Sequence, residues 1–408
     1  MGFKLLVLDS SFSYEAIVNR NLQTSVTCRD LDGFFEHVWT VHPFATLVTS
    51  PDWCTPFGRS KTYLINKNNT FIEGKIGFSR YLAKFQSLNF LVAQFSLIYS
   101  LYKLIKFEKI NVIRAGDPLY IGLLCYIISK LTGIPFLVRV GSNNEKIRLT
   151  TNNRIMPRLF NTMNQERFVE RFVLKRADFV AGANIDNLKY AISFGADSSK
   201  STIFRYGNLI DQVHFSEPHS RKKPEINFIK KPFLLSIARL EKIKKVEDVI
   251  RVLAGVRSCG FDVSAIVVGD GRERSNLETF AIELGVQHDV IFCGNKDQNW
   301  LASIIPYASV FLSPHTGRAL TEASLGGIPV VAYDIDWQSE LIESGITGEL
   351  VAYGDCETFT KRTLKILNNR YYALKVGSNL REKTLKMMDP FILNSHEIKT
   401  YSHLINGQ

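Results

Sequence analysis

Two basic side chains follow an apolar run in the second half of the chain and could bind phosphate. The segment FLLSIARLEKIKK runs from Phe233 to Lys245; its apolar residues lead to Arg239, five residues before Lys244. A guanidinium offers paired N–H donors and an ammonium adds a compact charge, so together they can neutralise a pyrophosphate without a metal ion. Basic residues also occur in solvated turns, which is the simpler interpretation of the same pair.

A carboxylate lies close to a second loop that could bind anions, in the stretch from Ala308 to Glu349. An apolar strand ends near Leu312, a loop with Gly317 follows, and the next helix carries Glu322. We expect Glu322 in the first turn of that helix, where exposed amides attract anions and where a carboxylate could hold two neighbouring ribose hydroxyls. An acidic residue in a first turn also stabilises a helix through its dipole, so Glu322 alone does not decide between the two roles.

A glycine-containing loop follows a third apolar strand. The segment SAIVVGDG, from Ser264 to Gly271, ends in two glycines that allow a tight turn or the close approach of a ligand. It is only part of a GxGxxG motif, because Arg274 stands where the third glycine would be. A dehydrogenase is therefore weakly supported.

These segments, in this order, resemble the carboxyl-terminal half of family 4 of the glycosyltransferases, which are retaining, depend on nucleotide sugars and have the GT-B fold. The segments IFCGN, from Ile291 to Asn295, and GIPVVAYD, after Glu322, add to the resemblance. It implies an α/β chain of two Rossmann-like domains that face each other across a cleft. It also implies that Arg239 and Lys244 bind the diphosphate of a UDP- or GDP-sugar and that Glu322 holds its ribose, with no other cofactor and no metal. The donor-binding residues that it implies are Gly269, Gly271, Gly294, Asn295, His315, Thr316, Gly317, Arg318 and Ala319.

The chain departs from the family pattern at three places. Pro314 stands where the family has a first glutamate, Lys245 stands where a glycine follows the lysine, and the stretch from Arg114 to Asp117 lacks the family's histidine. No side chain can therefore be named as a nucleophile. Besides a glycosyltransferase, the sequence leaves open a catalytically inactive, scaffold-like subunit, or a GT-B sugar-nucleotide epimerase or phosphorylase.

The first half also has an α/β pattern. We expect strands at Lys4–Leu8, Asn111–Arg114 and Pro135–Val140, and a helix at Tyr120–Leu131. Polar residues at the strand ends are candidates for binding an acceptor, although capping and loop roles are the simpler interpretation. His42 is a further candidate, and we expect it in a loop, because its spacing from His37 fits neither one helix face nor one strand face. The acceptor-side candidates are Asp117, Arg139, Asn143 and His42.

The balance of charges favours acidic partners. The 408 residues carry a formal net charge of +11, and no nucleic-acid-binding motif is present. The aromatic and basic stretch from Arg80 to Lys109 could form a helix at the surface of an anionic membrane, but polar residues interrupt it, so we do not expect it to span a bilayer. Burial of this helix against the first domain is the favoured alternative. A lipid-linked or lipopolysaccharide-type glycan would fit as acceptor.

Four segments are expected. Residues 1–215 form an acceptor-binding domain, 216–231 a proline-rich charged linker, 232–385 a nucleotide-sugar-binding domain, and 386–408 a helix that crosses back to the first domain. The six cysteines show no metal-ligand spacing, which indicates reduced thiols, no disulfides and no structural zinc. The amino terminus lacks a secretory signal pattern. The expected location is the cytoplasm, with attachment to the inner face of the cytoplasmic membrane as an open alternative.

Overall fold

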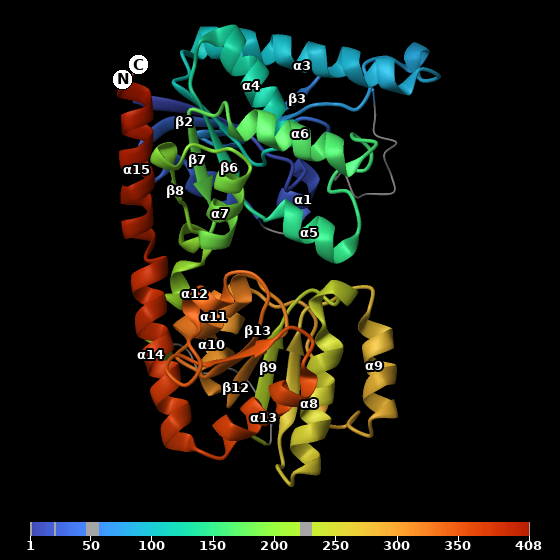
Figure 1. The fold of residues 1–408 in the computed structure, drawn as a ribbon, viewed down its shortest axis with the longest axis vertical. Helices are drawn as coiled ribbons and strands as arrows, with labels where there is room; N and C mark the ends of the chain where they lie inside the picture. Colours follow the sequence, from blue (N-terminus) through green and yellow to red (C-terminus); the bar gives the residue numbers. More distant parts are fainter. Residues whose placement is uncertain (1, 20–21, 46–56, 221–230, 408) are drawn as a thin grey trace. The chain divides into compact units, whose positions relative to one another are not determined.

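The computed structural model describes residues 2–19, 22–45, 57–220 and 231–407. Contacts divide the chain into two compact units, which Figure 1 shows coloured along the sequence. Unit 1 comprises Met1–Leu209 and Pro390–Gln408, and unit 2 comprises Ile210–Asp389. The division therefore falls earlier than the predicted boundary at residue 215. Most of the predicted linker, residues 221–230, lies outside the described residues.

Unit 1 is built on an eight-stranded sheet in the order β3-β4-β2-β1-β5-β6-β7-β8. All neighbouring strands are parallel except β3 and β4, which are antiparallel. Since β2 and β5 lie on opposite sides of β1, the strand order reverses there, and the carboxyl ends of β1 and β5 form the switch point at which such sheets bind ligands. The strands are β1 (Phe3–Leu8), β2 (Phe35–His42), β3 (Lys61–Asn66), β4 (Asn69–Glu73), β5 (Val112–Ala115), β6 (Phe136–Val140), β7 (Phe179–Gly182) and β8 (Ser201–Ile203).

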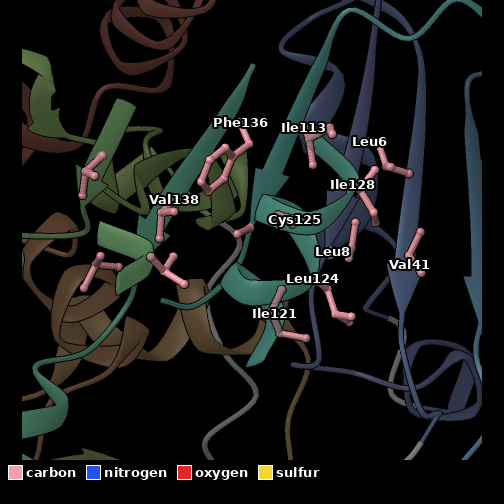
Figure 2. Packing of buried hydrophobic residues seen from close by; sticks show 14 of the residues in the cluster. Leu6, Leu8, Val41, Ile113, Ile121, Leu124, Cys125, Ile128, Phe136 and Val138 are labelled. Atoms are coloured by element: carbon pink, nitrogen blue, oxygen red, sulfur yellow. The ribbon is translucent and has the colours of Figure 1, made fainter. Parts of the chain in front are cut away.

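Helices cover both faces of this sheet, because its buried strands are apolar on both sides. Along β1, Leu6 and Leu8 pack with α4 in one core cluster, and Leu5 and Val7 belong to the cluster on the other face. Figure 2 shows the first cluster, with Cys125 of α4 among the strand residues. The helices of unit 1 are α1 (Tyr14–Asn19), α2 (Thr24–Thr27), α3 (Gln86–Glu108), α4 (Tyr120–Thr132), α5 (Asn144–Thr151), α6 (Met163–Leu174), α7 (Ile185–Ser193) and α15 (Pro390–Asn406).

The last helix, α15, belongs to unit 1 although it follows unit 2 in the sequence. Tyr401 is fully buried and packs edge-to-face on Phe35, with ring centroids 5.1 Å apart. Glu397 lies 3.8 Å from the guanidinium of Arg139, and Asn394 donates a hydrogen bond to Asp32 at 2.7 Å. The C-terminal residues therefore complete the core of the first unit.

Unit 2 has a six-stranded parallel sheet in the order β11-β10-β9-β12-β13-β14. Its buried apolar strands explain the continuous hydrophobic runs in the sequence. The strands are β9 (Phe233–Ile237), β10 (Ser264–Val268), β11 (Val290–Phe292), β12 (Val310–Ser313), β13 (Val330–Asp334) and β14 (Glu349–Ala352). The helices are α8 (Val246–Ser258), α9 (Arg274–Glu283), α10 (Gln298–Ile304), α11 (Arg318–Leu325), α12 (Gln338–Leu341), α13 (Cys356–Leu367) and α14 (Arg370–Met388).

One secondary-structure prediction was wrong. His42 was expected in a loop, but it is the last residue of β2, and His37 lies in the same strand. A spacing of five places the two side chains on opposite faces of a strand. Their environments therefore differ, because His42 is fully buried and His37 is partly exposed.

Candidate functional site: the carboxyl-end loops of unit 2

The carboxyl ends of the parallel strands of unit 2 bring the predicted phosphate-binding and ribose-binding residues to one edge of the sheet. The loop after β9 carries Arg239 and Lys244, and the loop after β12 leads into α11, which carries Glu322. The two strands are neighbours in the sheet. Segments far apart in the sequence therefore meet at the edge where α/β sheets bind their ligands.

The glycines after β10 hold the Arg239 loop in place. A Cβ on Gly269 would lie 1.9 Å from the carbonyl oxygen of Ala238, and one on Gly271 would lie 2.3 Å from that of Leu240. The amide of Leu240 donates a hydrogen bond of 3.0 Å to the carbonyl of Asp270. Only glycine fits such close backbone contacts. These glycines position the segment on both sides of Arg239, and the close approach that they allow is between two loops of the protein.

Arg239 itself is largely exposed. Its guanidinium lies 3.0 Å from the carboxylate of Glu241, and the two side chains are 64% and 41% exposed. An ion pair so open to water contributes little stability, so a phosphate could replace Glu241 at small cost.

Lys244 is more enclosed and is already directed at the second loop. Its Nζ lies 3.1 Å from Nδ1 of His315 and donates to the carbonyl of Thr316 at 3.4 Å. Burial, reinforced by the charge of Arg239, lowers the pKa of Lys244 below its ordinary value. Burial and the Lys244 charge likewise lower the pKa of His315, while its contact with the carbonyl of Thr316, 2.9 Å from Nδ1, opposes this effect. The tautomer decides whether Nδ1 donates to Thr316 or accepts from Lys244. Two neighbouring cations that lack an enclosed counter-charge favour an anionic ligand.

Lys245 stands where the family pattern has a glycine, and the backbone conformation shows why a glycine would fit there. Its backbone has φ 53° and ψ 36°, in the left-handed region that favours glycine. The chain must turn there between the short helix Lys242–Lys244 and α8. The local geometry therefore suits the family's glycine, and this chain adopts it with a lysine.

Glu322 is buried, and it lies one turn further into its helix than predicted. It is the fifth residue of α11, which begins at Arg318. It therefore lies in the second turn and does not stabilise the helix dipole as an acidic residue in the first turn would. The side chain is 3% exposed, and no hydrogen bond joins its carboxyl group to another described residue. Burial raises the pKa of Glu322 to about 7; Arg318 opposes this effect and Asp211 adds to it. A buried carboxyl group without a partner is costly for folding, which favours a ligand-binding role.

The remaining predicted donor-side residues lie in two loops. Gly294, with φ +66°, follows β11 and accepts the amide hydrogen bond of Gly269 through its carbonyl at 2.9 Å, and Asn295 beside it is exposed. In the loop after β12, the hydroxyl of Thr316 is buried without a hydrogen-bond partner among the described residues. Gly317 and Arg318 are exposed and Ala319 is partly buried at the start of α11, where the first backbone amides have no partner within the helix itself.

The acceptor-side candidates of unit 1 have mostly structural roles. Arg139 donates to the carbonyls of Phe204 and Arg205, each at 3.1 Å. Asn143 caps α5 by accepting the amide hydrogen bond of Lys146 at 3.0 Å. His42 is fully buried, and its Nδ1 accepts the amide hydrogen bond of Ala45 at 3.0 Å.

Asp117 differs from these three residues, because it lies at the switch point of the sheet of unit 1. Its carboxylate accepts the amide hydrogen bond of Leu119 at 2.7 Å. Burial raises the pKa of Asp117 to about 7, with Asp9 adding to the effect. Asp9, directly after β1, forms an ion pair with the buried Arg29. Asp9 was not among the predicted site residues, although its position after the first strand could have indicated it.

In the parts of the chain that the structure describes, no group of three or more histidine, cysteine, aspartate or glutamate residues could hold a metal ion.

Most of unit 2 is similar in sequence to a known family of proteins. Residues 219–384 match the family described as glycosyl transferases group 1. The chain is 25% identical to the N-acetyl-alpha-D-glucosaminyl L-malate synthase of Bacillus anthracis over 181 residues, which cover 43% of this chain and 47% of that protein. The chain thus spans about half the length of such curated relatives.

Solved structures extend the likeness to both units. The fold is similar to sucrose-phosphate synthase from Thermosynechococcus elongatus, with a TM-score of 0.73, 16% identity and all of both chains covered. It is also similar to Anabaena HepE solved in complex with UDP, with a TM-score of 0.69, 16% identity, and 98% of this chain and 100% of that one covered. These likenesses confirm the predicted GT-B fold of two Rossmann-like units. Residues 219–384 are thus similar in sequence to the group 1 glycosyl transferases, and both units are similar in fold to the solved structures.

Proposed function

We propose that this protein transfers a sugar from a nucleotide diphosphate sugar to a glycan or lipid-linked acceptor. The observation that carries the proposal is the meeting of Lys244, the His315–Thr316 loop and Glu322 at one edge of unit 2, where Glu322 is buried and has no hydrogen-bond partner among the described residues. A nucleoside diphosphate offers what these groups lack, namely two phosphates for the cations and two ribose hydroxyls for the carboxylate. The solved relative that binds UDP supports a nucleotide-sugar donor.

The chemistry that these groups provide is electrostatic. As the bond between the anomeric carbon and the phosphate oxygen breaks, negative charge develops on the leaving diphosphate. In this proposal Arg239, Lys244 and the backbone amides at the start of α11 stabilise that charge, because charges and dipoles held by the protein are the most effective stabilisers of a transition state. In this proposal the cations perform the neutralisation that a metal ion performs in other transferases.

The finer features of the reaction rest on the family resemblance. We propose that the anomeric configuration is retained, that the donor is a UDP- or GDP-sugar, and that the product belongs to a cell-surface polysaccharide or lipopolysaccharide. No further cofactor is needed. The proposed location is the cytoplasm, where nucleotide sugars are available as donors.

Turnover of a donor tests the proposal. Purified protein in EDTA is incubated with UDP-glucose or GDP-mannose and a mixture of lipid-linked glycans, and the released UDP or GDP is measured. We expect release that depends on acceptor and that falls at least tenfold in Lys244→Ala, with the anomeric coupling of the product reporting retention. Binding of nucleotide without any release would instead support an inactive scaffold-like subunit.

A further inference from the structure

One helix of unit 1 presents apolar side chains to solvent along its whole length. In α3, Leu88, Leu91, Phe95, Tyr99 and Tyr102 are 50%, 51%, 68%, 59% and 36% exposed. At 100° per residue they fall within an arc of roughly 80°, so they form a single stripe about 21 Å long. We call these five residues the α3 face. Figure 1 shows α3 at the edge of unit 1, beside α4.

The opposite side of the same helix belongs to the core of unit 1. Leu97, Leu101 and Ile105 are at most 3% exposed and are part of the main core cluster. Two buried polar residues fix the helix further: Asn89 accepts the amide hydrogen bond of Phe78 at 2.7 Å, and Gln94 accepts the hydroxyl of Tyr120 at 3.0 Å. The favoured prediction, burial of this helix against the first domain, is therefore right for one side of α3 and wrong for the other.

The charges around the α3 face have one sign. Lys103 lies 4.4 Å from the ring centroid of Tyr99, and Lys106 lies 5.9 Å from that of Tyr102. None of the residues classed as exposed in α3 is acidic; the half-buried Glu108 is paired with Lys4 at 3.0 Å. Before the helix, Lys84 is exposed beside Phe85 and Tyr81, which are 65% and 98% exposed. Tyrosine rings with lysine ammonium groups beside them are typical of the boundary between lipid head groups and acyl chains.

We propose that the α3 face docks on an anionic lipid bilayer. The apolar stripe enters the acyl boundary, while the cations at both ends of the helix meet anionic head groups. Among the described residues α3 is the one helix long and apolar enough to cross a membrane, but a third of its most apolar window is buried inside unit 1. Crossing would require Leu97, Leu101 and Ile105 to leave the core, so the helix lies on the membrane.

Charge favours a bilayer over a second copy of this chain. If two α3 faces packed antiparallel, Lys84 of one copy would approach Lys103 and Lys106 of the other. If they packed parallel, each lysine would meet its own counterpart. Like charges opposite each other destabilise both arrangements, whereas an anionic surface pairs with all of them. Docking on a bilayer involves the α3 face of unit 1 and is a property separate from the proposed transfer reaction.

Flotation of the full-length protein with vesicles tests the inference. We use phosphatidylcholine vesicles with and without 30% phosphatidylglycerol, at low and high salt. We expect binding to the anionic vesicles only, and its loss at high salt, since salt screens the lysines. Lys103→Gln/Lys106→Gln should weaken binding about thirtyfold, because each lysine near an anionic surface contributes about 1 kcal/mol. The matched control Lys375→Gln/Lys386→Gln removes two exposed lysines of α14 and should bind like the wild type.

A second pair of variants tests the apolar stripe. Phe95→Gln/Tyr99→Gln should reduce vesicle binding at least tenfold, and Leu374→Gln/Phe391→Gln, at side chains 63% and 77% exposed in α14 and α15, should not. Thermal unfolding checks that every variant is folded. Equal binding to neutral vesicles, or full binding by either α3 variant, would overturn the proposal. So would a dimer in light scattering that Phe95→Gln/Tyr99→Gln dissociates. Nucleotide binding, measured on the same preparations without lipid, tests the proposed function separately.

Discussion

Acidification should weaken the binding of a nucleotide sugar through one residue, Glu322. The buried carboxyl group has a pKa of about 7, raised by burial from the model-compound value of 4.5. Below pH 7 it is increasingly protonated and can no longer accept hydrogen bonds from both ribose hydroxyls. The affinity for a nucleotide sugar is therefore highest above pH 7 and falls as the pH decreases.

The size of this loss of affinity follows from the ionised fraction of the Glu322 carboxyl group. With a pKa of about 7, that fraction falls about twenty-five-fold between pH 7.5 and pH 5.5, which corresponds to about 1.9 kcal/mol of binding free energy. His315 does not reproduce this trend, because its pKa is lowered and its protonation would add positive charge beside the phosphates. Glu322→Gln keeps His315 and the shape of the site, so it isolates the carboxyl group.

Calorimetric titration with UDP-glucose or GDP-mannose at pH 5.5, 6.5 and 7.5 measures the effect. A nucleotide sugar is used because both of its phosphates are esterified and neither titrates in this range, unlike a terminal phosphate. We expect the dissociation constant of the wild type to rise about twenty-five-fold from pH 7.5 to pH 5.5. The Glu322→Gln variant should bind weakly at every pH. A wild-type dissociation constant that is independent of pH, or that changes equally in the variant, would refute the role of Glu322.

Three further predictions concern single side chains. Lys244→Met should weaken diphosphate binding about tenfold to a hundredfold in calorimetry, as expected for a hydrogen bond to a charged group, while the exposed neighbour Lys242→Met should have little effect. Lys245→Gly should raise the free energy of unfolding by about 1 kcal/mol in urea titrations, because φ 53° is strained for lysine; a loss of stability would contradict this. Arg148→Met should cost about 3–5 kcal/mol, since it leaves the carboxylates of Glu166 and Glu170 buried without their cation, and an unchanged melting temperature would exclude that role.

The architecture of unit 2 could be predicted because its signals are local. Apolar runs of strand length end in loops with Arg239, Gly269 or Gly317, and parallel strands bring such loops to one edge of a sheet. The position of Glu322 was displaced by one turn, because helix boundaries depend on where the backbone first closes its hydrogen bonds. The sequence does not locate that point.

Contacts between distant segments could not be predicted. The contact of Lys244 with His315 joins residues 71 apart, and the hydrogen bond of Arg139 to Phe204 joins residues 65 apart. The contact of Arg139 with Glu397 depends on how α15 packs on unit 1. Residue type indicates that such groups are polar, but only packing determines their partners. The same limit applies to α3, which carries apolar residues on two sides, because only the fold determines which of these sides is buried.

Binding of a nucleoside diphosphate by the carboxyl-end loops of unit 2 underlies the proposed transfer reaction. Its most direct test is calorimetric titration of the full chain with UDP, GDP, ADP and CMP in EDTA, repeated with Arg239→Ala and Lys244→Ala. We predict that one diphosphate binds selectively and that each variant weakens this binding at least tenfold, in keeping with a charge-assisted contact. Binding of none of the four, or binding that both variants leave unchanged, would contradict the claim.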